Sequence, residues 1–215
     1  MGGAELRQHL SDWAGDDPAL AIAFSGGPDS LALARLATAA GLYPTLLHVD
    51  HGTAEADAGR HRAALLATEL GLPFHCTPVV IDSKARGFEA GARNARYAAL
   101  QAGFDGRIWL AHTRDDYIET IWLRLLRGSS PLFWATMPAR RGAFERPLLA
   151  IPRADLEPWC GGAFADPMNQ DGRFDRVWLR QADLVAQYDP TGEIADLAVA
   201  LSERLQALRV GEWTA

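Results

Sequence analysis

The chain has 215 residues, of which 48% are hydrophobic and 22% are charged, and its formal net charge is -6. This length can bury one sizeable core, and the negative charge argues against non-specific binding of nucleic acid by the whole surface. No apolar run reaches the roughly 18 to 20 residues that span a bilayer, and the N-terminus does not resemble a signal peptide, so we expect a cytoplasmic protein that does not enter a membrane.

Short apolar segments alternate with helical patterns between residues 20 and 128. We predict strands at 20–24, at 45–49, within 74–81 and at 107–111. We predict helices from Leu31 to near Gly41 and at 57–70, 89–102 and 115–126. Short strands separated by helices are typical of βαβ units, which form a parallel sheet, and right-handed crossovers put helices on both of its faces.

The pattern weakens past Gly128, where residues 129–175 are rich in Pro, Gly and Arg. In this part of the chain we predict an edge strand and two helices, at 144–149, 176–187 and 194–208. The predicted fold class is therefore α/β, a doubly wound parallel sheet with a helical C-terminal tail. The predicted division is a catalytic domain of residues 1–187 and a tail of residues 188–215.

A glycine-containing turn joins the first predicted strand to the first predicted helix. Its residues are Ser25, Gly26, Gly27, Pro28, Asp29 and Ser30. Ligands gather at the carboxyl ends of strands in such sheets, glycines let the backbone approach a ligand, and free N–H groups at a helix start favour an anion. The Walker A lysine is absent, which excludes a kinase or GTPase loop, and Asp29 beside phosphates would hold Mg²⁺ or a cationic partner. A turn without a ligand is the structural alternative.

Polar residues also end the second and fourth predicted strands. His48 and His112 stand at these strand ends, and Asp115, Asp116 and Glu119 follow His112 at the start of the next helix. Residues three or four apart on a helix lie near each other, so these acids can form one cluster. Acids in a first helical turn are also ordinary partners of the helix dipole, and a lone histidine is usually structural, so both interpretations stay open.

Arginines supply the remaining candidates. Arg93 and Arg96 are three residues apart near the start of a predicted helix, where they could bind phosphate or pair with acids. A basic stretch follows, made of Arg124, Arg127, Arg140, Arg141 and Arg146. This stretch could contact nucleic-acid phosphates locally despite the negative net charge of the chain.

The loop Ser-Gly-Gly-x-Asp-Ser after an apolar strand resembles the signature of the PP-loop superfamily of ATP pyrophosphatases, whose fold is adenine nucleotide alpha hydrolase-like. Further segments resemble the tRNA(Ile)-lysidine synthetase family, in the family's order, at 111–120, 126–131, 145–149, 166–171 and 175–180. The resemblance covers roughly residues 18–182. It implies a ligase that uses ATP and Mg²⁺ to adenylate the C2 oxygen of the wobble cytidine of tRNA(Ile). The ε-amine of free L-lysine then displaces AMP to give lysidine. The resemblance is also compatible with a homodimer.

The resemblance implies roles for single residues. The expected catalytic residues are Asp29, His112, Asp116 and Glu119, with Mg²⁺ on Asp29. The expected nucleotide-binding residues are Ser25, Gly26, Gly27, Pro28, Asp29, Ser30, His48, Arg93, Arg127 and Gly128. The expected residues for tRNA and lysine are Asp115, Asp116, Glu119, Arg140, Arg141, Arg176 and Arg180.

Two positions depart from the family pattern, because Ser130 stands where glycine is usual and Val177 where asparagine is usual. We expect a short form, without the C-terminal tRNA-binding domains of longer members. The alternatives are another PP-loop adenylating enzyme, for tRNA thiolation or for joining small molecules, and a non-catalytic nucleotide-binding module. Cys76 and Cys160 form no C-x-x-C pair, which counts against a cluster-dependent thiolation enzyme. The expected catalytic residues, taken together, count against a bare binding module.

Overall fold

The computed structural model describes residues 1–15, 19–50, 52, 54–79, 88–130, 137–161, 178–179, 183–189 and 191–212. Its centre is a six-stranded sheet with the strand order β3-β2-β1-β4-β6-β5. The strands are β1 (Leu20–Ala23), β2 (Thr45–Asp50), β3 (Phe74–Pro78), β4 (Arg107–Trp109), β5 (Arg140–Arg141) and β6 (Phe144–Glu145). Neighbouring strands are parallel except β5 and β6, which form an antiparallel hairpin.

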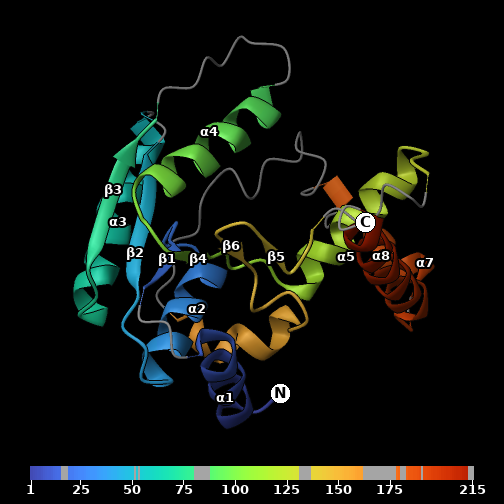
Figure 1. The fold of residues 1–215 in the computed structure, drawn as a ribbon, viewed down its shortest axis with the longest axis horizontal. Helices are drawn as coiled ribbons and strands as arrows, with labels where there is room; N and C mark the ends of the chain where they lie inside the picture. Colours follow the sequence, from blue (N-terminus) through green and yellow to red (C-terminus); the bar gives the residue numbers. More distant parts are fainter. Residues whose placement is uncertain are drawn as a thin grey trace.

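Helices cover both faces of this sheet, with α1 and α2 below it and α4 above it in Figure 1. The helices are α1 (Gly3–Ala14), α2 (Pro28–Ala39), α3 (Ala54–Leu70), α4 (Phe88–Ala102), α5 (Arg114–Leu126), the 3-10 helix η2 (Arg153–Trp159), α7 (Leu184–Tyr188) and α8 (Glu193–Glu212). Ile22 and Leu46 are buried with α1, α2 and α3, whereas Ala21 and Leu47 are buried with α4. Successive strand residues point to opposite faces, so each strand contributes to two cores.

The C-terminal helix α8 packs against α5, beside the sheet (Figure 1). Tyr117 and Ile121 of α5 are buried with Ala198 of α8, and Arg114 forms an ion pair with Asp196. The helical tail is therefore docked on the helix that follows β4. Within the described ranges, none of the helices has both the length and the apolar character to cross a membrane.

The hairpin edge of the sheet is held by side chains as well as by the backbone. Glu145 of β6 is only 6% exposed. Its carboxylate accepts a hydrogen bond from the indole N–H of Trp109 at 2.9 Å. It also lies 3.5 Å from guanidinium nitrogens of Arg107 and of Arg140. This one carboxylate therefore connects three strands, β4, β5 and β6.

The predicted doubly wound α/β sheet and the C-terminal helix are confirmed. The predicted edge strand at 144–149 is wrong, because β6 ends at Glu145 and lies between β4 and β5. The true edge strand, β5, consists of two arginines without apolar alternation, so its pattern does not indicate a strand. The sequence pattern also does not predict α1 or η2. Of the helix predicted at 176–187, residues 176, 177 and 180–182 are outside the described residues, and the described ones include α7, which ends at Tyr188.

Candidate active site

The candidate site lies at the carboxyl ends of β1 and β4, which are neighbours in the middle of the sheet. The chain leaves β1 for α2 and leaves β4 for α5. From β1 the strand order continues to β2 and β3 on one side and to β4 on the other, so the order reverses at this point. Ligands of doubly wound sheets bind in the crevice at such a position.

The glycine loop after β1 turns tightly into α2. Gly26 has a φ of 78°, a left-handed conformation that residues with a side chain rarely adopt, so the turn favours a glycine. The hydroxyl of Ser30 donates to the carbonyl of Gly27 at 3.0 Å, and the hydroxyl of Ser25 accepts from the N–H of Gly27 at 3.2 Å. The loop is therefore fixed by its own hydroxyl groups. The start of α2 offers backbone N–H groups to an anion, as expected of a phosphate-binding loop.

His48 supports this loop from the neighbouring strand. Its Nδ1 lies 2.8 Å from the carbonyl oxygen of Phe24, the residue just before the loop, and its ring lies beside Phe74. Burial lowers the pKa of His48, so at neutral pH the ring is uncharged and Nδ1–H can donate to that carbonyl. The described contacts of His48 fix the end of β1, and its predicted contact with the nucleotide stays a prediction.

Arg153 is the central cation of the site, and the sequence analysis does not identify it. Its Nε lies 3.2 Å from Oδ1 of Asp29, and its Nη2 lies 3.4 Å from Oδ2 of the same carboxylate. Nη2 also lies 3.1 Å from Oδ1 of Asp116, and Nη1 lies 3.9 Å from Oε1 of Glu119. One guanidinium therefore joins the acid of the glycine loop to the acids of α5.

The surroundings of Arg153 stabilise its positive charge. Burial alone would lower its pKa, but the carboxylates of Asp116 and Asp29 and the hydrogen bond to Asp29 outweigh burial and raise the pKa above its ordinary value. Arg153 begins η2, and Asp29 lies 124 residues away in sequence. No local pattern marks such a residue. Only the folded chain brings it to the site.

The start of α5 positions the acids that follow β4. Asp116 forms a capping box with Thr113, because its Oδ2 accepts from the Thr113 N–H at 2.9 Å and from the Thr113 hydroxyl at 3.0 Å. The Oδ2 of Asp115 accepts from the backbone N–H of Arg153 at 2.7 Å. His112 is half-buried directly before this cap. Both acids thus have structural contacts in addition to their predicted roles.

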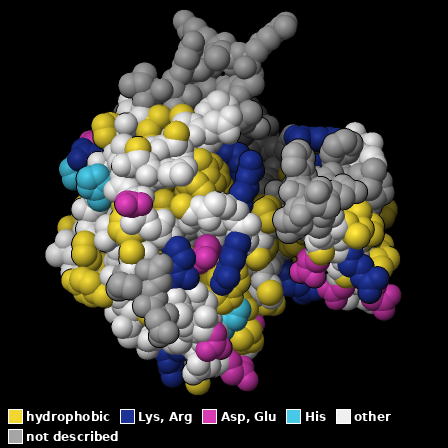
Figure 2. All heavy atoms as spheres, in the orientation of Figure 1, with side chains coloured by type: hydrophobic (Ala, Val, Ile, Leu, Met, Phe, Trp, Pro, Cys, Tyr) yellow, Lys and Arg dark blue, Asp and Glu magenta, His cyan; other side chains and the backbone are white. Residues whose placement is uncertain are grey.

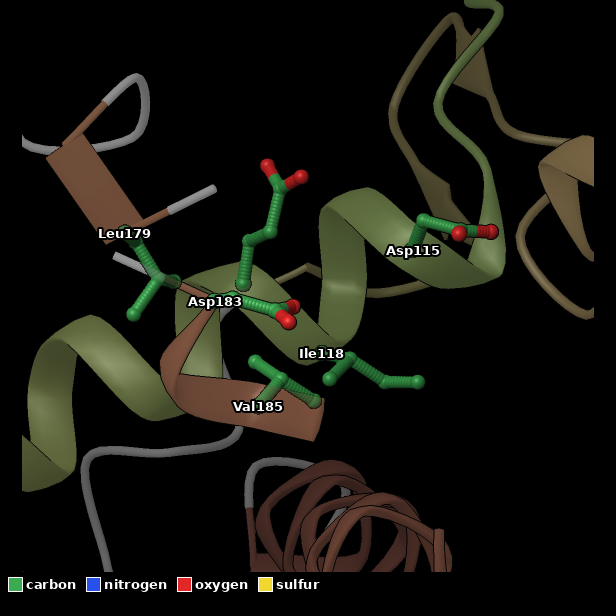
Figure 3. Close-up of a pocket in the computed structure, with 6 residues that line it drawn as sticks. Asp115, Ile118, Leu179, Asp183 and Val185 are labelled. Atoms are coloured by element: carbon green, nitrogen blue, oxygen red, sulfur yellow. The ribbon is translucent and has the colours of Figure 1, made fainter. Parts of the chain in front are cut away.

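An acidic pocket opens between α5 and the segment around α7 (Figure 3). Its volume is about 260 Å³, and it is lined by Asp115, Ile118, Glu119, Leu179, Asp183 and Val185. In Figure 3, Ile118 and Val185 approach each other from the two elements, and the carboxylate of Asp183 points towards α5. The pocket is small relative to drug-sized sites of about 300–1,000 Å³. Its apolar walls and carboxylates suit a compact cation with an aliphatic stem.

Mg²⁺ fits this site as a partner of the nucleotide. Among the residues that the structure describes, no group of three His, Cys, Asp or Glu side chains is arranged to hold a metal. Mg²⁺ commonly takes one or two protein carboxylates together with substrate phosphates. Asp29, in the first turn of α2, would supply one carboxylate of this kind, and in this structure both of its oxygens contact Arg153.

Arg127 and Gly128 lie at the opposite end of α5 from Asp115 and Asp116. Arg127 and Gly128 follow the last residue of α5, and the 13 residues of α5 separate its two ends by about 18 Å. Arg93 is exposed and lies over the ring of Tyr97 at 5.2 Å from the centroid. Arg176 and Arg180 are outside the described residues.

The two arginines of β5 face opposite sides of the sheet edge. The Arg140 guanidinium lies 4.6 Å from the ring centroid of Trp13 in α1. Arg141 lies near Arg146 on the other face, where the charges of Arg93 and Arg141 act on the Arg146 guanidinium. Figure 2 shows arginine side chains gathered in the middle of one face of the molecule. The predicted basic stretch is therefore divided between two surfaces.

Comparisons with known proteins agree on the family. A model of the PP-loop domain family matches residues 4–186. A tRNA(Ile)-lysidine synthase of Mycobacterium tuberculosis is 41% identical over 194 residues, which cover 87% of this chain and 59% of that protein. The tRNA(Ile)-lysidine synthase of Bradyrhizobium diazoefficiens is 41% identical over 215 residues, with 90% and 59% covered. This chain thus spans about 59% of the length of these relatives.

Solved structures share the fold at low sequence identity. The U34-tRNA thiolase NcsA of Methanococcus maripaludis has a TM-score of 0.70 at 16% identity, covering 94% of this chain and 78% of the thiolase. An NH3-dependent NAD synthetase of Campylobacter jejuni has a TM-score of 0.51 at 14% identity, covering 96% and 95%. At this identity the likeness concerns the fold alone.

Proposed function

This chain belongs to the PP-loop domain family, and we propose that it is an ATP-dependent ligase that forms lysidine on tRNA(Ile). In the first step, the C2 oxygen of the wobble cytidine attacks the α-phosphorus of ATP, and pyrophosphate leaves. In the second step, the ε-amine of L-lysine forms a bond to C2, the C2–O bond breaks, and AMP leaves with the oxygen. The amine loses a proton to a base of the enzyme. The tRNA(Ile)-lysidine synthases similar to this chain support the proposal.

One observation carries the proposal, namely the guanidinium of Arg153 that contacts both Asp29 and Asp116. A single side chain can join only groups that lie close together. A nucleotide at the glycine loop and an amine beside α5 would therefore be near enough to react in succession. Holding two reactants in contact is a large source of rate enhancement.

The glycine loop and Asp29 would serve the first step. Backbone N–H groups at the start of α2 would bind the phosphates, and Asp29 would hold the Mg²⁺ that neutralises developing charge on them. The hydroxyl groups of Ser25 and Ser30 keep the loop in shape through the hydrogen bonds described above. The tRNA would approach over the basic surfaces around Arg140 and Arg141.

The acidic pocket would serve the second step. Lysine enters as a cation, because its unperturbed pKa is about 10.4. The carboxylates of Glu119 and Asp183 would attract the ammonium group, while Ile118 would contact the aliphatic stem. The amine must lose its proton to attack, and Glu119 and His112 are the candidates to accept it. Asp115 also lines this pocket, whereas Asp116 does not.

The test uses the purified chain with tRNA(Ile) transcripts, ATP labelled at the α-phosphate, and L-lysine. We expect AMP and pyrophosphate as products and labelled lysine joined to the tRNA. A transcript with uridine at the wobble position is the matched control and should receive no lysine. Formation of ADP and phosphate, or lysine transfer to the control transcript, would contradict the proposal.

Several further assignments stay predictions. These are the cytoplasmic location, a homodimer, and the division into a catalytic domain of residues 1–187 and a tail of residues 188–215. One alternative, a PP-loop enzyme for tRNA thiolation, differs from this chain in its need for cysteines. Thiolation through an iron–sulfur cluster needs several cysteine ligands, and this chain has two cysteines, Cys76 and Cys160.

A further inference from the structure

The guanidinium of Arg153 occupies a position that is surrounded by carboxylates. Asp29 approaches it from α2, and Asp116 and Glu119 approach it from α5. The N–O distances are 3.2 Å for Asp29, 3.1 Å for Asp116 and 3.9 Å for Glu119. These oxygens are acceptors that a metal ion or an ammonium group would also use. The bound guanidinium therefore stands in the place of an incoming cation.

The backbone of Arg153 is held in place by a hydrogen bond, whereas its side chain is partly exposed to solvent. The backbone N–H donates to Asp115 at 2.7 Å, and the residue begins η2. The side chain is 28% exposed, whereas those of Asp116 and Glu119 are 10% and 8% exposed. An arginine side chain has many rotamers, and its guanidinium can be hydrated on the side that faces solvent. The guanidinium could thus move out while the main chain and the acids stay in place.

The chemistry of the acids makes this movement useful. Carboxylates buried without a cation are unfavourable, because desolvation penalises their charged form. Arg153 compensates that cost before ligands arrive and keeps the acids turned towards one point. A divalent ion at Asp29 would repel the guanidinium, so each of the two cations weakens the binding of the other to this carboxylate.

We propose that Arg153 is a resident counter-cation of this site, which holds Asp29 until a divalent cation replaces it. Arg153 is thereby a positioning residue, because it acts on the reaction through the carboxylates that it orients. The assignment of the incoming ion to Mg²⁺ with ATP rests on the proposed function. The competition between Arg153 and a divalent cation for Asp29 does not, and it can be measured without ATP or tRNA.

The test is a titration of the nucleotide-free chain with Mn²⁺, followed by the electron paramagnetic resonance signal of the free ion. Arg153→Gln removes the competing charge and should bind Mn²⁺ about tenfold more tightly than the wild type, which corresponds to about 1.4 kcal/mol. The double variant Asp29→Asn with Arg153→Gln should lose this gain. Arg204→Gln, an exposed change on α8 with the same effect on net charge, should bind as the wild type does.

Circular dichroism checks that each variant is folded. If Arg153→Gln does not fold, Arg153→Lys replaces it, because a lysine keeps the charge but cannot span Asp29 and Asp116 in the same way. That variant should bind Mn²⁺ about threefold more tightly, or about 0.7 kcal/mol. Unchanged or weaker Mn²⁺ binding in the folded variant, or a gain that survives Asp29→Asn, would overturn the proposal. A failed lysidine assay would leave this result unaffected.

Discussion

Replacing Glu119 with glutamine is expected to weaken the binding of lysine while leaving adenylation intact. Glu119 is buried and lines the acidic pocket between α5 and α7. A hydrogen bond between charged groups contributes about 1.5–3 kcal/mol, and about 1.4 kcal/mol is a tenfold change in a binding constant. If Glu119 binds the ammonium group, the apparent KM for lysine should rise about 10- to 140-fold.

The assay follows the two steps separately, by pyrophosphate release and by transfer of labelled lysine to tRNA. Asp116→Asn is the matched comparison, because it removes one charge from the same helix at a residue that caps α5 and does not line the pocket. It should raise the KM for lysine less than Glu119→Gln does. An unchanged lysine KM in Glu119→Gln, or equal increases in the two variants, would refute the pocket assignment. Loss of pyrophosphate release in Glu119→Gln would place the residue in the first step instead.

Three further outcomes are expected. Asp29→Ala should lower pyrophosphate release by about 10²-fold or more in a protein that still folds. Its melting temperature should fall slightly, because the contact with Arg153 is lost. Turnover near the wild-type value would reject the role of Asp29. The unfolding free energy should decrease as the pH falls below 6.5, because burial lowers the folded-state pKa of His48 and the unfolded chain takes up the proton first. His48→Asn should reduce this dependence of the unfolding free energy on pH, which for one proton is at most about 1.4 kcal/mol per pH unit. Urea titrations that give the same pH dependence for His48→Asn and the wild type would count against the assignment to His48. Arg141→Gln should weaken tRNA binding and flatten its salt dependence. Arg140→Gln should weaken tRNA binding less, because Arg140 also contacts Trp13 and Glu145. A larger loss of tRNA affinity in Arg140→Gln than in Arg141→Gln would contradict this prediction.

The sequence predicts those parts of the molecule that have a local signature. Apolar segments such as the one containing Ile22 become buried strands, and the glycine loop is recognisable because its left-handed backbone at position 26 favours glycine. The same reasoning cannot find Arg153 or Asp183, because their positions depend on contacts between distant segments.

Local patterns also carry more than one meaning. Thr113 and Asp116 have the spacing of a capping box, and the structure contains that box, whereas the sequence analysis assigns Asp116 to catalysis. Asp116 supports both interpretations, because one of its oxygens faces Thr113 and the other faces Arg153. The sequence pattern alone could not show that the two oxygens of Asp116 have different partners.

The carboxylate of Glu145 has a consequence for how the sheet loses its order. β5 and β6 have two residues each, so they contribute few main-chain hydrogen bonds to the sheet. Side chains add to these bonds, through the contacts of Glu145 with Trp109, Arg107 and Arg140 and through the burial of Phe144 against Tyr97. The hairpin can therefore act as a separate cooperative unit, which opens at a lower free energy than the central strands. Substitutions at this edge would change the mobility of the arginine surface without unfolding the strands that carry the glycine loop.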